Sequence, residues 1–225
     1  MSSVVQACAL VKRFGTGERA TRAVDGVSLS VDAGDFAVLA GPSGCGKTTL
    51  LNLLGGLERP DAGRVSVGGT SLELLDPTAL ARLRLERVGF IFQAANLIPA
   101  LTAFENAEFT LQVRGVPRVE RRRRLGVLFD RLGIAGLETR YPGEMSGGEQ
   151  QRVAVARALA GEPAIVLADE PTANLDSVAA AALLELLSAL NRERGVALLV
   201  ASHDPLVIGR AGRVLLMRDG KIAPA

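Results

Sequence analysis

The stretch from Gly41 to Thr49 carries the residue types and spacing that most clearly predict chemistry. It reads Gly41-Pro42-Ser43-Gly44-Cys45-Gly46-Lys47-Thr48-Thr49 and fits the pattern G-x-x-x-x-G-K-[ST]. An apolar run at 36–40 predicts a buried strand before it, and a run at 50–54 predicts a helix after it. Such a loop turns backbone N–H groups toward a phosphate at a helix N-terminus. We expect Lys47 to reach the β- and γ-phosphates of a nucleotide and the Thr48 hydroxyl to bind Mg²⁺.

Two acids and the only histidine of the chain follow predicted buried strands. The apolar run 164–168 is followed by Asp169 and Glu170, and the run 196–201 is followed by Ser202 and His203. The carboxyl ends of parallel strands form the ligand edge of an open α/β sheet, so these side chains are expected to meet there. Asp169 suits Mg²⁺, and Glu170 suits a general base that orients an attacking water.

Two further positions carry weaker local signals. Ser146 and Glu149 have the spacing of a capping box at the start of a predicted helix over 146–160, with two glycines between them that favour a second phosphate contact. Phe14, beside the flexible stretch 15–17, could stack on a nucleotide base. Taken by itself, Phe14 is better interpreted as an ordinary, partly buried aromatic.

The elements that must position these residues are predicted from periodicity and capping. Strands are expected at 4–11, 27–32, 64–67, 88–92 and 213–217, and helices at 77–87, 102–113, 118–132 and 178–192. Strand patterns are absent from 94–140, which indicates a helical subdomain (94–140) inserted into an α/β core formed by 1–93 and 141–225.

Composition restricts the classes of partner. The 225 residues carry a net charge of only +2, and Arg121–Arg124 is best interpreted as a solvated helix face, so we expect no nucleic acid. No apolar run is long enough to cross a bilayer, and the first residues lack a leader pattern. Two widely spaced cysteines favour a reducing cytoplasm over a disulfide framework.

Taken in order, these motifs resemble the nucleotide-binding subunit of ABC transporters over essentially the whole chain. The set comprises the phosphate loop, Gln93, Ser146-Gly147-Gly148-Glu149-Gln150, Asp169-Glu170, Asn174-Leu175-Asp176 and His203. The resemblance implies an α/β P-loop NTPase core of mixed, largely parallel sheet, with an antiparallel β subdomain and the inserted helical subdomain. It also implies ATP and Mg²⁺ as cofactors, a head-to-tail dimer with ATP held between two copies, and integral membrane permease subunits as partners at the inner face of the cell membrane.

The resemblance implies roles for individual residues. Phe14 resembles the aromatic that stacks on adenine. Gln93 resembles the glutamine that touches Mg²⁺ and the attacking water and that senses the permease. Residues 145–150 resemble the signature motif, in which Ser146, Gly148 and Glu149 would cap the γ-phosphate of ATP held by the other copy. Asp176 resembles an acid at the dimer interface, and His203 resembles the histidine that contacts the γ-phosphate.

The chain departs from the family pattern at three places. Met145 replaces a leucine of similar volume, which should be mild. Glu149 replaces a glutamine and is expected to place a carboxylate near the γ-phosphate, which would weaken closure of the dimer. Cys45 stands where serine or alanine is commoner, and its place beside Lys47 at a helix N-terminus is expected to make the thiol reactive.

Within the family, the chain is most similar to the LolD/MacB group, which also includes FtsE-like ATPases. The similarity is carried by 50–57, 89–93 with 96–99, and 167–172 with 174–176. Export or lipoprotein release is therefore expected, with signalling to cell-wall enzymes or an importer ATPase as alternatives. A P-loop kinase would not need 145–150, and ABC-type ATPases that act on DNA or ribosomes usually carry a coiled coil or a second ATPase domain.

Overall fold

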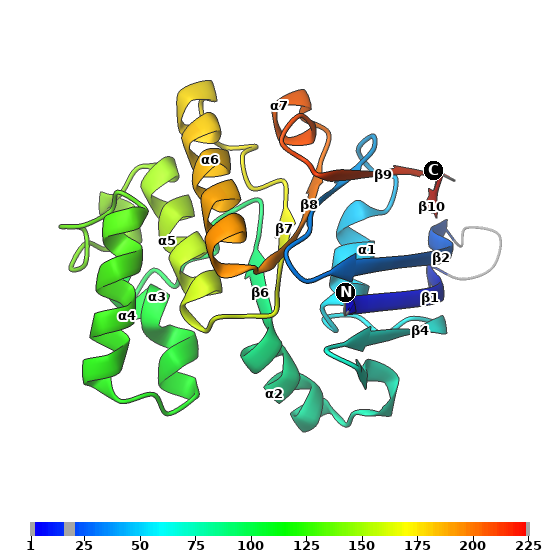
Figure 1. Cartoon of the computed structure of the whole chain (residues 1–225), viewed down its shortest axis with the longest axis horizontal. Helices are drawn as coiled ribbons and strands as arrows, with labels where there is room; N and C mark the ends of the chain where they lie inside the picture. Colours follow the sequence, from blue (N-terminus) through cyan, green and yellow to red (C-terminus); the bar gives the residue numbers. More distant parts are fainter. Residues whose placement is uncertain (1–2, 16–20, 224–225) are drawn as a thin grey trace.

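A six-stranded sheet lies at the centre of the computed structural model, which describes residues 3–15 and 21–223 (Figure 1). Its strand order is β10 (Lys221–Ile222), β9 (Arg213–Arg218), β3 (Phe36–Ala40), β8 (Ala197–Ser202), β7 (Ile165–Asp169) and β6 (Val88–Ile91). The five strands from β9 to β6 are parallel, and β10 pairs antiparallel with β9. The expected mixed, largely parallel sheet is confirmed.

Both faces of this sheet are covered by other elements, and successive side chains of a strand therefore enter two different cores. In β3, Val38 packs into a core on the side of helices α5 (Gly147–Ala160) and α6 (Ser177–Arg194). Its neighbours Ala37 and Leu39 belong to a second core, formed with helix α1 (Lys47–Leu54) and the second sheet. A fully apolar strand such as 36–40 is what burial on two faces requires.

The second sheet is antiparallel, with the order β2 (Thr21–Asp32), β1 (Ser3–Phe14), β4 (Ala62–Val67) and β5 (Thr70–Ser71). Strands β1 and β2 are longer than the predicted 4–11 and 27–32. The β1–β2 register shifts between Ala7 and Leu10, where Ala9 has a φ of 50°. Such a bulge lets pairing continue where simple alternation of polar and apolar residues has ended, so the sequence pattern missed it.

The helices begin where capping predicted. Helix α2 (Pro77–Arg87) is capped by the Asp76 carboxylate, which accepts from the N–H of Ala79 at 2.8 Å. Helix α3 (Ala103–Val113) has the complete Thr102–Glu105 capping box. Helix α4 (Arg118–Arg131) follows, and its buried apolar face is the predicted one: Leu125, Leu128 and Phe129, with Leu132 directly after the helix. Residues 94–140 contain no strand. The short helix α7 (Pro205–Ile208) follows β8.

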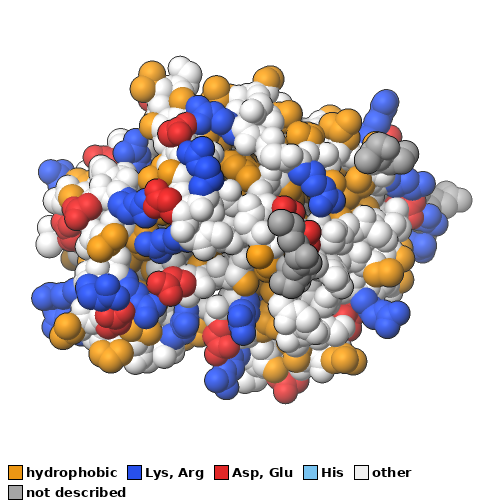
Figure 2. All heavy atoms as spheres, in the orientation of Figure 1, with side chains coloured by type: hydrophobic (Ala, Val, Ile, Leu, Met, Phe, Trp, Pro, Cys, Tyr) orange, Lys and Arg blue, Asp and Glu red, His pale blue; other side chains and the backbone are white. Residues whose placement is uncertain are grey.

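The arginine block on α4 is largely engaged by glutamates. Arg121 pairs with Glu108 of α3, and Glu120 accepts from both Arg123 and Arg124. The hydrogen bonds from Arg123 and Arg124 lower the pKa of the Glu120 carboxyl to about 2. On the face shown in Figure 2, Lys and Arg side chains are interspersed with Asp and Glu rather than gathered into one basic field.

Across residues 3–15 and 21–223, no helix combines the length and the apolar character needed to span a bilayer.

Candidate functional site

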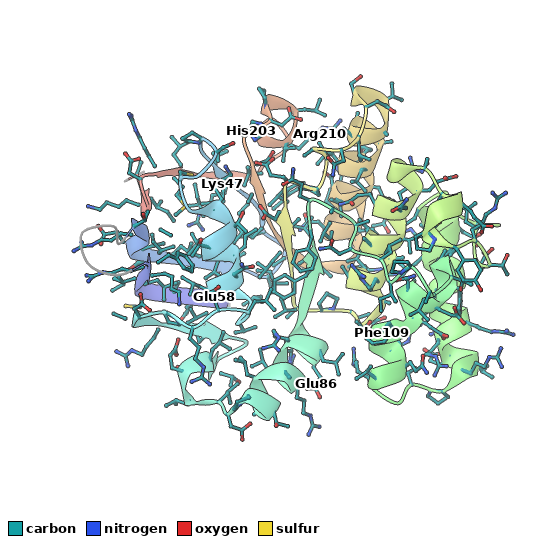
Figure 3. All side chains as sticks on the ribbon, turned by 180° about the vertical axis from the view of Figure 1, so that it is seen from behind. Lys47, Glu58, Glu86, Phe109, His203 and Arg210 are labelled. Atoms are coloured by element: carbon teal, nitrogen blue, oxygen red, sulfur yellow. The ribbon has the colours of Figure 1, made fainter. Side chains whose placement is uncertain are left out.

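Four neighbouring strands deliver the predicted site residues to one edge of the central sheet. The phosphate loop follows β3, Gln93 follows β6, Asp169 and Glu170 stand at the end of β7, and Ser202 and His203 stand at the end of β8. A hollow of about 300 Å³ lies at this edge. It is lined by Ala23, Ser43, Gly44, Gly46, Lys47, Thr48, Thr49, Gln93, Asp169 and Glu170. Figure 3 shows Lys47 and His203 at the same end of the sheet.

Two glycines of the loop are required by close backbone contacts. Gly46, the residue before α1, has a φ of 107°, and a Cβ there would lie 2.0 Å from the carbonyl oxygen of Ala23. A Cβ on Gly41 would lie 2.2 Å from the carbonyl oxygen of Met217. Any side chain at either position would displace the loop, so the curled backbone depends on glycine.

The hairpin formed by β9 and β10 is hydrogen-bonded to the backbone of the phosphate loop. The N–H of Gly220 donates to the carbonyl of Cys45 at 3.0 Å, and its carbonyl accepts from the N–H of Asp25 at 2.8 Å. Cys45 is only 6% exposed and packs into the core beside Met217. The expectation of a reactive thiol at Cys45 is therefore not supported, because a reagent needs access to the sulfur.

Lys47 is buried at the bottom of the hollow. Its Nζ donates to the carbonyls of Gly41 at 2.7 Å and Pro42 at 3.1 Å, and it lies 3.7 Å from Oε1 of Glu170. An ammonium has three N–H donors, so one remains for a ligand after the two carbonyls are served. The lysine is thus held in place as a positive charge aimed into the hollow.

Thr48 and Asp169 form a pair of oxygen ligands beside the loop. The Thr48 hydroxyl donates to Oδ2 of Asp169 at 2.7 Å. Burial raises the pKa of Asp169, while the Thr48 hydrogen bond acts in the opposite direction. Within the described residues, no three His, Cys, Asp or Glu side chains gather into a metal cage. A hydroxyl and one carboxylate next to a phosphate loop fit Mg²⁺, which usually takes few protein ligands and completes its shell with phosphates and water.

Glu170 is held at both carboxylate oxygens and at its backbone N–H. Its Oε2 accepts from the Ser202 hydroxyl at 3.0 Å, and its Oε1 lies 2.8 Å from Nδ1 of His203. Its N–H donates to the carbonyl of Ala201 at 2.9 Å, and its φ of 43° lies in the left-handed region. Strained backbone of this kind persists only where the surroundings enforce it, which is common at functional sites.

The predicted signature residues lie outside this hollow. Its lining, among the described residues, includes none of 145–150, nor Asp176, nor Phe14. Ser146 caps α5, and Asp176 caps α6 by accepting from the N–H of Ala179 at 2.8 Å. Phe14 ends β1, is 45% exposed, and has the Lys12 ammonium 5.5 Å from its ring centroid. Residues 16 and 17, named with it above, fall outside the described residues.

Glu149 points back at the start of its own helix. Its Oε2 accepts from the Ser146 N–H at 2.7 Å and from the Ser146 hydroxyl at 2.8 Å. These hydrogen bonds lower the pKa of the Glu149 carboxyl, so it remains ionised. The carboxylate therefore completes the predicted capping box, and in this chain it is directed at Ser146 rather than outward.

Comparison with known proteins places this site in a family. The family model described as ABC transporter matches residues 24–173, which include the phosphate loop, the signature segment, and Asp169 and Glu170. The chain belongs to the ABC transporter family. It is 40% identical over 222 residues to the lipoprotein-releasing system ATP-binding protein LolD of Geobacter metallireducens, covering 99% of each. It is 45% identical over 213 residues to the macrolide export ATP-binding/permease protein MacB of Hyphomonas neptunium.

The coverage differs between these two relatives of the ABC domain. The matched segment is 95% of this chain but only 33% of that MacB, so the chain spans about a third of it. A solved dimeric ATP-binding cassette, in a post-hydrolysis state bound to ADP and Pi, is similar in fold with a TM-score of 0.90 and 37% identity. That match covers 98% of this chain and 97% of the cassette.

Several side-chain contacts that organise the site of this ABC domain were not predicted from the sequence. Ser202, which is fully buried, holds Glu170, and its place directly before His203 was the available signal. Asn174 donates to the carbonyl of Gln93 at 3.0 Å. Gln151 and Arg157 of α5 also bind the segment around Gln93. Nothing in their spacing indicated these contacts, because their partners lie 59 to 81 residues away in the chain.

Proposed function

We propose that this chain binds and hydrolyses ATP to power a membrane transporter of the LolD/MacB type. The observation that carries the proposal is the meeting of Lys47, Asp169 and Glu170 in one hollow at the phosphate loop. The names of the relatives, lipoprotein release and macrolide export, favour outward movement of cargo over import.

The geometry supports a division of labour in phosphoryl transfer. Lys47 neutralises charge on the phosphoryl oxygens, and Glu170 orients and polarises the attacking water and takes up its proton. Ser202 and His203 fix the two oxygens of Glu170 for that task. Thr48 and Asp169, with Gln93 nearby, would hold Mg²⁺, which supplies charge neutralisation between the β- and γ-phosphates when bound.

Two copies are needed to complete the site in this proposal. The hollow of one chain lacks any residue of 145–150 in its described lining. The N-terminus of α5, with Ser146 and Gly148, would approach the γ-phosphate held by the second copy. The dimeric state of the solved cassette supports this arrangement.

A groove beside the Gln93 segment is proposed as the docking place of the permease. It has a volume of about 360 Å³ and lies among α2, β6, α3 and α5. Its lining is mainly apolar and includes Leu57, Leu85, Phe90 and Phe92. Phe109 of α3 is 44% exposed and lies across the molecule from Lys47 (Figure 3). In this proposal the helical subdomain, 94–140, forms one wall, and the chain sits at the cytoplasmic face of the membrane through its partner.

Replacing Glu170 with glutamine tests the chemistry. Glu170→Gln should leave ATP binding intact and trap an ATP-bound dimer, because the amide cannot take the proton of the water. Turnover should fall by roughly 10²- to 10⁴-fold, the usual contribution of a general base. Phosphate release, nucleotide binding and size-exclusion chromatography give the three readouts. Glu86→Gln, on α2 away from the hollow, is the matched control. Near-normal hydrolysis by Glu170→Gln would remove Glu170 from this role.

The partner is tested with the same variant. Tagged Glu170→Gln protein, with ATP and Mg²⁺, is used to capture complexes from detergent-solubilised membranes of its own host, which are read by mass spectrometry. We expect a permease with few membrane helices and a large extracytoplasmic domain. Recovery of a many-helix permease together with a solute-binding protein would instead identify an importer.

A further inference from the structure

The segment 92–101, which joins β6 to α3, faces two different cavities. Gln93 lines the hollow at the phosphate loop, whereas Phe92 and Asn96 line the apolar groove. A movement of this short segment would therefore alter both cavities together. What holds the segment decides which part of the molecule can move it.

Side chains of α5 bind the backbone of this segment at two places. Gln151, which is buried, donates through Nε2 to the carbonyl of Phe92 at 3.0 Å. Arg157 donates to the carbonyls of Ala95 and Asn96, both at 2.8 Å. Both donors lie on the helix whose N-terminus is Ser146.

The segment has little backbone structure of its own. Among the described residues, its only backbone-to-backbone hydrogen bond outside helices and strands joins the N–H of Leu101 to the carbonyl of Ile98. Asn96 has a φ of 48°, a left-handed conformation that Asn tolerates better than most residues. Asn174 holds the Gln93 carbonyl, and Asn106 holds Ile98. The shape of 92–101 is therefore imposed by side chains from outside it.

Arg157 is suited to this task and is not engaged by an acid. In the described part of the chain, no Asp or Glu lies within 4.0 Å of its guanidinium. Arg157 is partly buried, and this burial lowers the pKa of its guanidinium. Its two carbonyl contacts are charge-assisted and come from one planar group, so they fix both distance and direction.

We propose that Gln151 and Arg157 are positioning residues that couple movement of α5 to movement of the segment 92–101. This rests on the proposed function, in which ATP on a second copy engages the α5 N-terminus. Arg157 lies ten residues beyond Gly147, or about 15 Å along a rigid helix. Displacement of the helix start therefore carries the carbonyls of 92, 95 and 96 with it. Gln93 and the wall of the groove then move in one step.

Hydrogen exchange measured by mass spectrometry tests this in the full chain carrying Glu170→Gln. ATP with Mg²⁺ should slow exchange of 92–101 by about tenfold, within the usual size of coupling between two sites. Adding Arg157→Met should reduce that change to less than about twofold while the ATP-bound dimer still forms. Gln151→Leu, which removes only the contact with Phe92, should weaken the response in the same direction.

Arg152→Met is the matched control. Arg152 lies on the same helix and donates to a backbone carbonyl, that of Leu132, away from the segment. It should leave the response of 92–101 unchanged. The inference would be overturned if Arg157→Met and Gln151→Leu each formed the ATP-bound dimer and the segment 92–101 still gained full protection from hydrogen exchange in both variants. Failure of the proposed function would look different, because the Glu170→Gln reference itself would form no ATP-dependent dimer.

Discussion

At the scale of single residues, each oxygen of Glu170 has a partner of its own. Oε2 is bound by Ser202, and Oε1 faces His203 and, at 3.7 Å, Lys47. A carboxylate fixed on both oxygens presents its remaining lone pairs in a constant direction. Such preorganisation lowers the cost of orienting a water at the moment of reaction. Ser202 is therefore a positioning residue rather than a contact of the nucleotide.

Removal of the Ser202 hydroxyl should slow hydrolysis without weakening ATP binding. Ser202→Ala deletes the 3.0 Å hydrogen bond to Glu170 and leaves the phosphate loop untouched. One hydrogen bond to a charged group contributes about 1.5 kcal/mol, so kcat should fall roughly tenfold with KM for ATP unchanged. Steady-state kinetics separates the two constants.

Ser188→Ala supplies the comparison, because the Ser188 hydroxyl donates to the Leu184 carbonyl within α6 and Ser188 does not line the hollow. Equal kinetics for Ser202→Ala and Ser188→Ala would show that Glu170 keeps its orientation without Ser202.

At the scale of elements, the local sequence pattern predicted the helix caps and the buried strands, but it did not predict the side-chain contacts between elements. The caps of α2, α3 and α5 at Asp76, Thr102 and Ser146 were found from their residue types and spacing, and Asp176, which caps α6, was one of two candidates beside Ser177. The apolar strands and their terminal acids were also found, because burial on both faces leaves a clear pattern. The bulge at Ala9 and the hydrogen bonds from α5 to the segment 92–101 were not predicted, because they depend on partners that only tertiary packing brings together.

The start of α3 offers a test of such a packed contact. Asn106 is fully buried, and its amide serves the N–H of Ile98 and the carbonyls of Ile98, Leu101 and Thr102. Asn106→Ala leaves the N–H of Ile98 and the carbonyl of Leu101 without these partners, which should cost about 3 kcal/mol and lower Tm by roughly 10 °C. Chemical and thermal denaturation measure both quantities.

Thr110, on the same helix, should behave in the opposite way. Within the described residues, its Oγ1 is a buried side-chain oxygen with no hydrogen-bond partner. Thr110→Val should therefore leave the free energy of unfolding unchanged or raise it by up to about 1 kcal/mol. A loss of stability as large as that of Asn106→Ala would mean that the hydroxyl is paired.

At the scale of the whole molecule, the proposed catalytic centre is divided between two copies. In the proposed dimer, Lys47 and Glu170 belong to the hollow of one chain, and Ser146, which lies outside that hollow, comes from the other. The two ATP sites of such a dimer are equivalent by symmetry, and each needs one intact half from each chain.

Complementation between two inactive variants tests this division. Lys47→Ala disables a chain's own phosphate loop, and Ser146→Arg disables the half that it offers to its partner. Each variant alone should be inactive. An equal mixture should recover about a quarter of the normal rate, because half of the dimers are mixed and each has one intact site. A mixture that stays inactive, while both variants still dimerise and fold, would contradict the shared centre.

The hairpin of β9 and β10 determines when the nucleotide site can be completed during translation. Met217 and Gly220 touch the phosphate loop, yet they follow it by about 170 residues along the chain. A ribosome adds roughly 5–20 residues each second, so the loop waits roughly 10 to 35 seconds for the backbone that supports it. A nascent chain therefore lacks a complete nucleotide site until the hairpin has left the ribosome, and ATP capture is deferred until that point.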